Sequence, residues 1–393
     1  MTAATLTSDE QLHWLALKLV PGLGPRRSRQ LTDHYHTPQA IFRASPSELE
    51  ACGISGSVAR TIASGCTFED AVDQHQRMID YDTTLIPITD DRYPPRLREI
   101  FDPPVVLFAR GRVDLLQSLM LGIVGTRRPT AYGVGATERL SADLAQAGLT
   151  IVSGMARGID TAAHKSALSI GGDTIAVFGC GVDNVYPAEN RKLADELAVK
   201  GLLLSEFPMC APAYPQNFPV RNRIISGMSA GVLIVEGAQY SGSAITARMA
   251  MEQQREVFAI PGSIMSRMSW GPNLLIKEGA KLVQDWNDVV VELSPADRRT
   301  LIAKAQSRQG SLPLNAENQP SETTNEQRTT TNELSLYARK LLNTLRPDTP
   351  THLDTLLESF DVCSSSETIA ALFELEMTGL ARQLPGKNFV RVW

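Results

Sequence analysis

The sequence lacks the features of secreted, disulfide-stabilised and membrane-spanning proteins. Its 393 residues include five cysteines, an odd number with no CxxC pair, which argues against a disulfide framework or a cysteine-based zinc site. No run approaches the ~18 uninterrupted apolar residues of a membrane span. The residues from Met1 to Glu10 have neither the basic nor the apolar region of a secretory signal. We therefore expect a soluble, cytoplasmic protein without membrane contact.

Excess positive charge is also missing, since the formal net charge is −5. This argues against a uniformly basic nucleic-acid coat, although a local basic patch would still attract phosphates. The six histidines are scattered, with only His34 and His36 close together, so we expect no metal site. What is present is a 43% hydrophobic fraction, enough for a sizeable core, and a length typical of two or three domains.

Three enzyme motifs are absent or out of context. Gly386-Lys387 is followed by Asn388, so there is no Walker A sequence. No full GxGxxG fingerprint follows the first predicted strand, which weakens the case for an NAD enzyme. Residues 227–231 match the GxSxG nucleophile elbow, but that elbow needs a strand before the serine and a helix after it. Here a helical segment precedes Ser229 and a strand follows it, so we do not expect a serine hydrolase. Since the nucleotide-binding motifs are also missing, we expect no bound cofactor.

The N-terminal region, residues 1–78, is predicted to be a helical domain of SAM-like or helix–hairpin–helix type. Segment 20–27 carries a Gly-Leu-Gly turn and segment 51–58 a similar Gly-Ile-Ser-Gly turn. Both resemble helix–hairpin–helix units, in which a Gly-hydrophobic-Gly turn points backbone N–H groups outward at a helix start. Arginines at positions 26, 27 and 29 follow the first turn. They either meet phosphates or are solvated on a helical packing module.

The central region, residues 79–293, alternates short apolar runs with helical segments. Apolar runs of this length between helices indicate a parallel sheet covered on both faces. We therefore predict an α/β domain with an extended Rossmann-like, doubly wound and mostly parallel sheet. The predicted strands are 121–124, 150–152, 174–178, 202–205, 232–235 and 257–260.

The C-terminal part divides into a linker and a small domain. Residues 294–332 are predicted to be a flexible linker, since the stretch from 306 onward is rich in Gln, Asn, Ser and Thr and has no aromatic residue. Residues 333–393 are predicted to form a winged-helix-like domain. Its expected elements are helices at 333–345, 352–358 and 364–377 and a hairpin at 381–393.

Small, polar and basic loops follow successive predicted strands of the central region. In an open α/β sheet, ligands bind beyond these carboxyl ends, where glycines allow close backbone approach and helix N-termini offer N–H groups. Arginines there add charge-assisted bonds to phosphate oxygens. One such loop alone could simply close a turn, but their recurrence at one edge predicts a phosphate-binding site. The candidates are Gly125, Thr126, Arg127, Arg128, Ser153, Gly154, Arg157, Gly158, Lys165, Gly179, Gly181, Tyr186, Asn190, Arg221, Asn222, Arg223, Ser241, Gly242 and Ser243.

Catalytic groups are less evident than phosphate-binding ones. Asp160, His164, Glu206, Glu236 and Glu252 are available near these loops. No pair of carboxylates with catalytic spacing stands out among them, and a catalytic site would need an acid, base or nucleophile in the same crevice. We expect a site that holds its ligand and does not cut it.

Six motifs stand out along residues 94–282. They are IVGTR (123–127), SGMARGID (153–160) with His164, YPAENR (186–191), NFPVRNRIIS (217–226), SGSAITAR (241–248) and EVFAIPG (256–262). Together and in this order they resemble the DNA-processing protein A (DprA/Smf) family. The helical N-terminal region and the winged-helix-like C-terminal region also agree with the family's longer members.

The resemblance implies a non-enzymatic recombination mediator that binds single-stranded DNA in a basic pocket. It also implies a homodimer that protects incoming DNA and loads RecA onto it, together with single-strand-binding protein, during natural transformation and homologous recombination. By this likeness the loop of Gly125, Thr126 and Arg127 grips a backbone phosphate. Tyr186 either stacks on a base or packs on the core. The adjoining pocket would be lined by Ser153, Gly154, Arg157 and Lys165, with Asn190, Arg221 and Arg223 nearby.

Several points stay open at this stage. The third helix of the C-terminal domain, around Glu367, Glu374 and Glu376, carries no Lys or Arg, so we expect it to bind protein, or DNA only weakly. Methionines 249 and 251 belong to the core or to a RecA-facing surface, and segment 273–282 is our choice for the dimer contact. One alternative function is a nucleoside-monophosphate phosphoribohydrolase with Glu236 or Glu252 against the ribose. Another is an interaction scaffold with a vestigial pocket.

Overall fold

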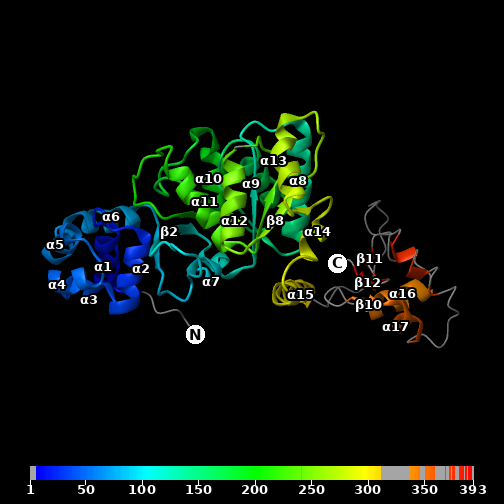
Figure 1. Ribbon diagram of the computed structural model, residues 1–393, viewed down its shortest axis with the longest axis horizontal. Helices are drawn as coiled ribbons and strands as arrows, with labels where there is room; N and C mark the ends of the chain where they lie inside the picture. The colour runs from blue at the N-terminus through cyan, green and yellow to red at the C-terminus, as the bar shows by residue number, and fades with distance from the viewer. Residues whose placement is uncertain are drawn as a thin grey trace, which may run out of the picture. The chain divides into compact units, whose positions relative to one another are not determined.

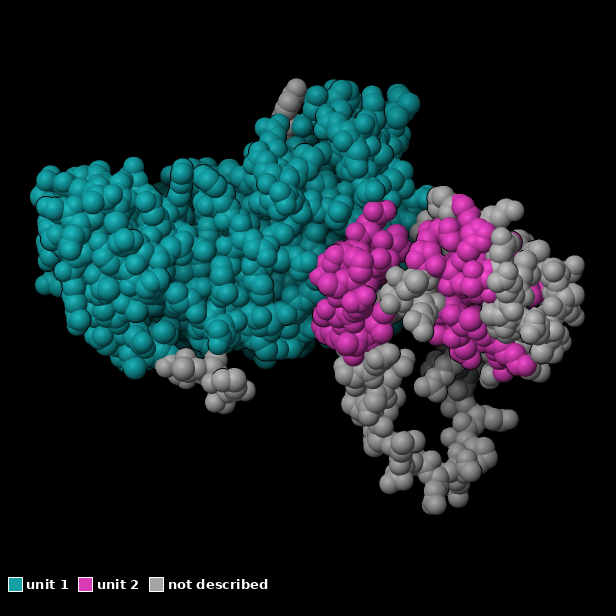
Figure 2. All heavy atoms as spheres, turned by 60° about the horizontal axis from the view of Figure 1, so that its bottom comes forward, with its two compact units in different colours: residues 1–288 teal, residues 289–393 magenta. Residues whose placement is uncertain are grey.

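The computed structural model describes residues 6–239, 241–310 and parts of 336–391, and Figure 1 shows its elements in chain order. Its contacts divide the chain into two compact units, Met1–Asp288 and Val289–Trp393 (Figure 2). Within the described residues, no helix has both the length and the hydropathy needed to cross a membrane.

Six helices form the N-terminal part of the first unit. They are α1 (Ser8–Leu19), α2 (Pro25–Tyr35), α3 (Pro38–Arg43), α4 (Pro46–Ala51), α5 (Gly56–Ser64) and α6 (Phe68–Asp80). Thr7 and Ser45 each close a capping box with a glutamate at the third helical position. Gly22 and Gly53 take a φ of 79° in the two predicted turns, where a residue with a Cβ would be strained.

This helical region and the sheet share one hydrophobic core, so the predicted first and second domains lie in one compact unit. The core extends from Trp14 in α1 to Leu275 near the end of the unit. Gln74 in α6 also binds the backbone of Met209. Its Oε1 accepts the Met209 N–H at 2.8 Å, and its amide donates to the Met209 carbonyl at 3.4 Å.

Among the three arginines after the first glycine turn, Arg29 has partners within the protein. Its Nε donates to Asp33 at 2.7 Å and its Nη1 donates to the Arg98 carbonyl at 3.2 Å. The guanidinium of Arg26 lies 4.8 Å from the ring centroid of Phe101. A phosphate contact at this turn stays a prediction.

A nine-stranded sheet forms the centre of the first unit. Its order is β1-β2-β6-β5-β4-β3-β7-β8-β9, with antiparallel pairs β1–β2 and β2–β6 and parallel pairs elsewhere. The mostly parallel α/β architecture and its six central strands, β3–β8, are confirmed. The strands are β1 (Thr84–Pro87), β2 (Val106–Gly111), β3 (Met120–Val124), β4 (Thr150–Ser153), β5 (Thr174–Phe178), β6 (Leu202–Ser205), β7 (Gly231–Ile234), β8 (Glu256–Ala259) and β9 (Lys281–Leu282).

Helices cover the sheet, and the order of the strands reverses beside β3. The chain runs from β3 through β4 and β5 to β6 on one side, then returns to β7 on the other side. Right-handed crossovers therefore place α8 and α12 on opposite faces. The helices are α7 (Pro95–Arg98), α8 (Ala131–Gln146), α9 (Ile159–Ser169), α10 (Arg191–Lys200), α11 (Asn217–Met228), α12 (Gly242–Glu252), α13 (Trp270–Lys277) and α14 (Trp286–Val290), with 3-10 turns η1 (Val113–Gln117), η2 (Ala188–Asn190) and η3 (Arg267–Ser269).

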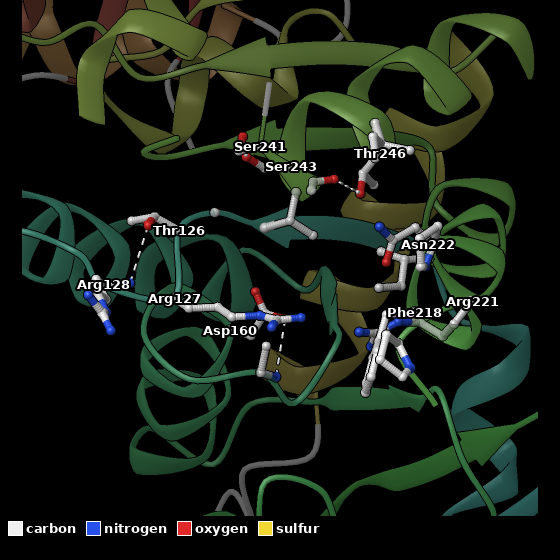
Figure 3. Close-up of a pocket in the computed structure, with 18 of the residues that line it drawn as sticks. Thr126, Arg127, Arg128, Asp160, Phe218, Arg221, Asn222, Ser241, Ser243 and Thr246 are labelled. Atoms are coloured by element: carbon white, nitrogen blue, oxygen red, sulfur yellow. Dashed lines mark hydrogen bonds between the residues drawn. The ribbon is translucent and has the colours of Figure 1, made fainter. Parts of the chain in front are cut away.

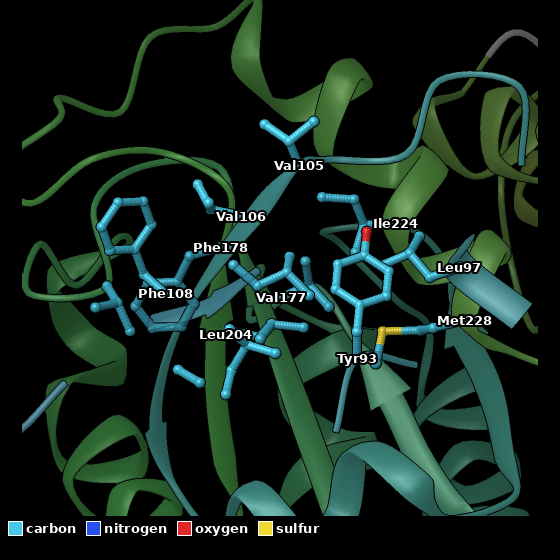
Figure 4. Packing of buried hydrophobic residues seen from close by; sticks show 14 of the residues in the cluster. Tyr93, Leu97, Val105, Val106, Phe108, Val177, Phe178, Leu204, Ile224 and Met228 are labelled. Atoms are coloured by element: carbon cyan, nitrogen blue, oxygen red, sulfur yellow. The ribbon is translucent and has the colours of Figure 1, made fainter. Parts of the chain in front are cut away.

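The core between the sheet and α7 and α11 is built from large side chains (Figure 4). Phe108 and Phe178 are almost wholly buried, as is Tyr93. The Tyr93 hydroxyl donates to the Pro104 carbonyl at 2.7 Å, which satisfies the one polar group that this ring brings into the core.

Ser229 has no nucleophile-elbow geometry, as the sequence predicted. It follows α11 and precedes β7, and its buried hydroxyl donates to the Ile225 carbonyl at 2.7 Å. A serine with a strand after it and its Oγ used inside the fold cannot present a nucleophile at the sheet edge.

The second unit contains the C-terminal elements. Helices α16 and α17 and the hairpin of β11 and β12 lie within the predicted elements, and a short strand β10 completes an antiparallel sheet of order β10-β12-β11. Leu341, Leu356, Leu375 and Phe389 are part of its core. Glu367 lies outside the described residues. The bounds are α15 (Pro295–Gly310), α16 (Leu336–Thr344), β10 (Thr351–His352), α17 (Leu353–Glu358), β11 (Ala381–Leu384) and β12 (Asn388–Arg391).

The start of the predicted linker differs from expectation, because residues 295–310 form helix α15. Ser294 and Asp297 cap its first turn. The Asp297 N–H donates to the Ser294 Oγ at 3.2 Å, and that hydroxyl donates to the Asp297 carboxylate at 2.8 Å. The polar composition of this segment concealed a helix start that its capping residues encode.

Candidate phosphate-binding site at the edge of the sheet

A cavity of about 630 Å³ lies where the strand order reverses, beyond the carboxyl ends of β3 and β7 (Figure 3). This is the place where open α/β sheets bind ligands. The loop after β3, the start of α12 and the first turns of α11 surround it. Its lining comprises Val124, Gly125, Thr126, Arg127, Arg128, Ala156, Asp160, Tyr186, Ala213, Pro215, Phe218, Pro219, Arg221, Asn222, Ile225, Ser241, Gly242, Ser243, Ile245, Thr246 and Met268. We call this cavity the sheet-edge pocket.

The loop after β3 is fixed in place by Glu236, which follows β7. The Glu236 carboxylate accepts the Thr130 N–H at 2.8 Å and the Thr130 hydroxyl at 2.6 Å. The Glu236 carbonyl accepts the Thr126 N–H at 2.7 Å. Glu236 is almost wholly buried, so these bonds are shielded from water and hold the loop firmly.

Arg127 is the one side chain of this loop that reaches into the middle of the pocket (Figure 3). Its guanidinium lies 5.6 Å from the ring centroid of Phe218, and it forms no ion pair with any residue that the structure describes. In contrast, Arg128 points away from Phe218 in the same view. Arg127 therefore presents an uncompensated positive charge to whatever enters the pocket.

Asp160 holds the loop after β4. Its carboxylate accepts the N–H groups of Gly154 at 3.1 Å and Ala156 at 3.3 Å. Burial raises the pKa of Asp160, while the nearby Arg221 charge opposes that rise. The loop turns sharply at Gly158, whose φ is 77°, a backbone conformation that glycine adopts without strain.

Arg221 and Phe218, one helical turn apart on α11, form the floor of the pocket. Arg221 is 4% exposed, and its Nη1 donates to the Val177 carbonyl. Burial lowers the pKa of Arg221 to about 10, although the charge of Asp160 raises it. The Phe218 ring also contacts Tyr186, with 5.4 Å between ring centroids and 42° between planes.

The start of α12 forms another side of the pocket. The Ser241 Oγ accepts the Ala244 N–H at 3.4 Å and lies 2.7 Å from the Ser243 Oγ. No acidic residue occupies the first turn of α12. Ser241 and Ser243 lie on the other side of the cavity from Arg127 (Figure 3), and a helix start opposite a cation is suited to an anion.

Several predicted site residues support the pocket from inside the protein and are not in its lining. The Ser153 hydroxyl is buried and donates to the Ile123 carbonyl at 2.6 Å. The Asn190 amide donates to the Met155 carbonyl and to the Thr161 hydroxyl, both at 2.9 Å. Both side chains are buried, and they hold neighbouring loops together.

Two predicted glycines also have supporting positions. A Cβ at Gly179 would lie 2.9 Å from Phe218 Cδ1, so the absence of a side chain lets that ring pack on the loop. The Gly181 N–H donates to the Ala211 carbonyl at 2.9 Å. Gly154 and Arg157 line a small neighbouring cavity of about 20 Å³ that shares Arg127 and Phe218 with the pocket.

Arg223 and Lys165 do not lie in the pocket lining, and their contact with DNA stays a prediction. Arg223 bonds Glu206 at 2.5 Å and Asp102 at 3.2 Å, with its side chain 7% exposed. Residues two positions apart in a helix point about 200° apart around its axis. Arg221 and Arg223 therefore project from different sides of α11. Lys165 is exposed on α9, next to the buried His164.

Phe218 is the main site residue that sequence reasoning missed. Its signal was available, since a spacing of three on one helix places Phe218 and Arg221 on the same side. Ala213, Pro215, Pro219 and Ile245 also line the pocket but carry no chemical signature that a sequence would reveal.

Glu236, Glu252 and His164, three of the five candidate catalytic residues, do not line the pocket. Glu236 is bonded to Thr130, and Glu252 lies at the far end of α12, where it lines a different cavity. His164 is fully buried with its Nδ1 2.7 Å from the Thr174 hydroxyl, and burial lowers its pKa to about 3. Within the described residues, no group of three or more His, Cys, Asp and Glu side chains could hold a metal ion.

Comparison with known proteins extends the description from the site to the whole chain. Residues 84–294 match the family model described as DNA recombination-mediator protein A, and residues 325–387 match the DprA winged helix domain. Protein Smf of Synechocystis sp. is 34% identical over 418 aligned positions, which cover 98% of this chain and 100% of that protein.

Two solved structures are also similar. The X-ray structure of DNA processing protein A from Streptococcus pneumoniae is 35% identical with a TM-score of 0.60, covering 74% of this chain and 99% of that one. A structure from Helicobacter pylori, described as giving insight into the single-stranded DNA binding mode of DNA processing protein A, is 31% identical with a TM-score of 0.50. It covers 57% of this chain and 97% of that one. The chain belongs to the DNA recombination-mediator protein A (DprA/Smf) family.

Proposed function

We propose that this protein is a recombination mediator that holds single-stranded DNA in the sheet-edge pocket. The observation that carries the proposal is the unpaired Arg127 guanidinium, which lies beside the Phe218 ring in a cavity that the start of α12 also lines. The pocket thus offers a cation, backbone N–H groups and an aromatic face together. Those are the groups that bind a phosphate and a neighbouring base.

In this proposal the phosphate lies between Thr126, Arg127 and the N–H groups at Ser243. A neighbouring base stacks on Phe218 or on Tyr186, whose side chain is 44% exposed. The cavity, at about 630 Å³, has the size of a small-molecule site. It suits an unpaired nucleotide better than a duplex, whose base faces are stacked on one another and unavailable to protein rings.

The wider functions implied by family membership belong to the same proposal. They are homodimerisation, loading of RecA with single-strand-binding protein, and protection of incoming DNA in natural transformation. For the dimer we retain segment 273–282, which contains the edge strand β9. We also retain a protein-binding role for the winged helix, where Glu374 and Glu376 lie on a described helical turn. The cytoplasmic location stays a prediction.

We further propose that the protein is not an enzyme. The alternative, a nucleoside-monophosphate phosphoribohydrolase, needs a glutamate free to meet the ribose. The Glu236 carboxylate instead caps the start of α8, and Glu252 lines another cavity. Release of free base from a nucleoside monophosphate by the purified protein would contradict this part of the proposal.

Fluorescence anisotropy with a labelled oligo-dT tests the proposal at two salt concentrations. We expect salt-sensitive binding by the wild type and a large loss in Arg127→Ala. The control is Arg139→Ala on α8, since Arg139 is 69% exposed and outside the pocket. Equal affinity of Arg127→Ala and wild type for the oligonucleotide would show that the DNA does not bind in the pocket. It would favour the scaffold alternative.

A further inference from the structure

The second arginine of the β4 loop, Arg157, is held by an acidic partner. Its Nε donates to Glu189 Oε1 at 2.6 Å, and its Nη2 donates to Glu189 Oε2 at 2.8 Å. The carboxylate thus binds the guanidinium through two parallel hydrogen bonds. Such paired bonds are the geometry that arginine also offers to a phosphate group.

One member of this ion pair, Arg157, lies beside the sheet-edge pocket. Arg157 lines the small cavity that it shares with Arg127, Tyr186 and Phe218. Glu189 belongs to η2, three residues after Tyr186 in the chain. A strand whose base reaches Tyr186 or Phe218 therefore carries its backbone past Arg157.

The pair is open to solvent and so can be exchanged. The two side chains are 56% and 54% exposed, and exposed ion pairs contribute little to stability because water and salt compete with them. No further hydrogen bond ties the Glu189 carboxylate to a described residue. A phosphate that arrives with an aromatic contact beside it can therefore displace the carboxylate.

We propose that Glu189 competes with a DNA phosphate for the Arg157 guanidinium, so that a bound strand takes the place of the carboxylate. Glu189 is then a positioning residue that keeps Arg157 extended beside the empty pocket and lowers the affinity for DNA. This inference rests on the proposed function. It adds to that function an acidic residue, Glu189, that lowers the affinity of the site for DNA.

The competition has a specific salt signature. In the wild type, Arg157 exchanges a carboxylate for a phosphate, and the released carboxylate attracts a cation. In Glu189→Gln the phosphate contact releases a cation with no compensating uptake. The slope of log affinity against log salt should therefore steepen by up to about 0.7 for one added single-strand contact.

The test is a set of oligo-dT anisotropy titrations across several salt concentrations. Glu189→Gln is expected to bind roughly 1.5- to 5-fold tighter than wild type at low salt. The gain should vanish when Arg157→Ala is also present. The control is Glu196→Gln, since Glu196 pairs with Lys200 at 2.8 Å on the surface of α10 and should leave binding unchanged.

The outcomes separate this inference from the proposed function. Wild-type binding with an unchanged or weaker Glu189→Gln affinity would overturn the competition alone. Equal tightening with and without Arg157 would also overturn it, because a general charge effect would then be the cause. No wild-type binding at any salt concentration would overturn the proposed function and this inference with it.

Discussion

Acidification should destabilise the first unit through a single buried ring, that of His164. This ring is fully buried between α9 and the sheet, and its Nδ1 lies 2.7 Å from the Thr174 hydroxyl. Its Nε2 has no hydrogen-bond partner among the described residues. Burial first, and the Arg221 charge second, lower the pKa of His164 from 6.5 to about 3.

The direction of the change in stability with pH follows from the difference in the His164 pKa between the folded and unfolded states. The unfolded ring takes up a proton near pH 6.5, while the folded ring stays neutral until about pH 3. Stability is therefore fully present above pH 6.5 and is lost progressively as the pH falls toward 3. Between pH 7 and pH 5 the linkage relation gives a loss of about 2 kcal/mol from this one site.

Urea denaturation at several pH values, followed by circular dichroism, measures the effect. The perturbation is His164→Gln, which keeps a polar group for Thr174 and removes the titration. Asp160, whose pKa is raised by burial, is present in both proteins, so its opposite contribution cancels in the comparison. We expect the wild type to lose about 2 kcal/mol more than the variant between pH 7 and pH 5.

The control is His34→Gln on α2, an exposed histidine; this variant keeps the buried His164 ring and should retain the pH dependence that we assign to it. Equal pH slopes for wild type and His164→Gln would refute the reasoning. They would show that the ring is protonated in the folded protein or reached by water.

Three substitutions separate binding from folding. Phe218→Ala should lose about 1–3 kcal/mol of oligo-dT binding free energy, because one base loses its stacking surface. Fluorescence anisotropy measures this loss, and wild-type affinity in the variant would exclude base stacking on Phe218. Glu236→Ala should lower the free energy of unfolding by about 2 kcal/mol, because two buried bonds to Thr130 are lost; an unchanged urea midpoint would contradict the loop-fixing role. Arg223→Met should destabilise the protein by about 3 kcal/mol, because the buried Glu206 carboxylate loses its ion pair. Urea denaturation measures this effect. Loss of DNA binding with the fold retained would place Arg223 in the site.

The sequence predicted the centre of the sheet better than its margins. The strands β3–β7 are buried along their length, so they appear as continuous apolar runs. The strand β1 is four residues long and ends in proline, and β9 has two exposed residues. Neither leaves a periodic signal, because their positions depend on pairing with distant strands.

The candidate site was predicted at the level of loops and less well at the level of side chains. Strand ends and glycines placed the loops correctly at one edge of the sheet. The direction of each side chain depends on helix phase and burial, which turned Arg223 toward Glu206 and the Ser153 hydroxyl toward the Ile123 carbonyl. The partner of Arg157 could not be predicted, since Glu189 comes from a different loop.

The central claim is that the sheet-edge pocket holds the strand, and photocrosslinking tests it most directly. An oligonucleotide carrying 4-thiothymidine would be irradiated in complex with the whole protein, and the crosslinked peptides would be mapped by mass spectrometry. We predict crosslinks at Phe218 and Tyr186 that disappear in Arg127→Ala. Crosslinks confined to the α1–α6 region or to residues 336–391 would contradict the account.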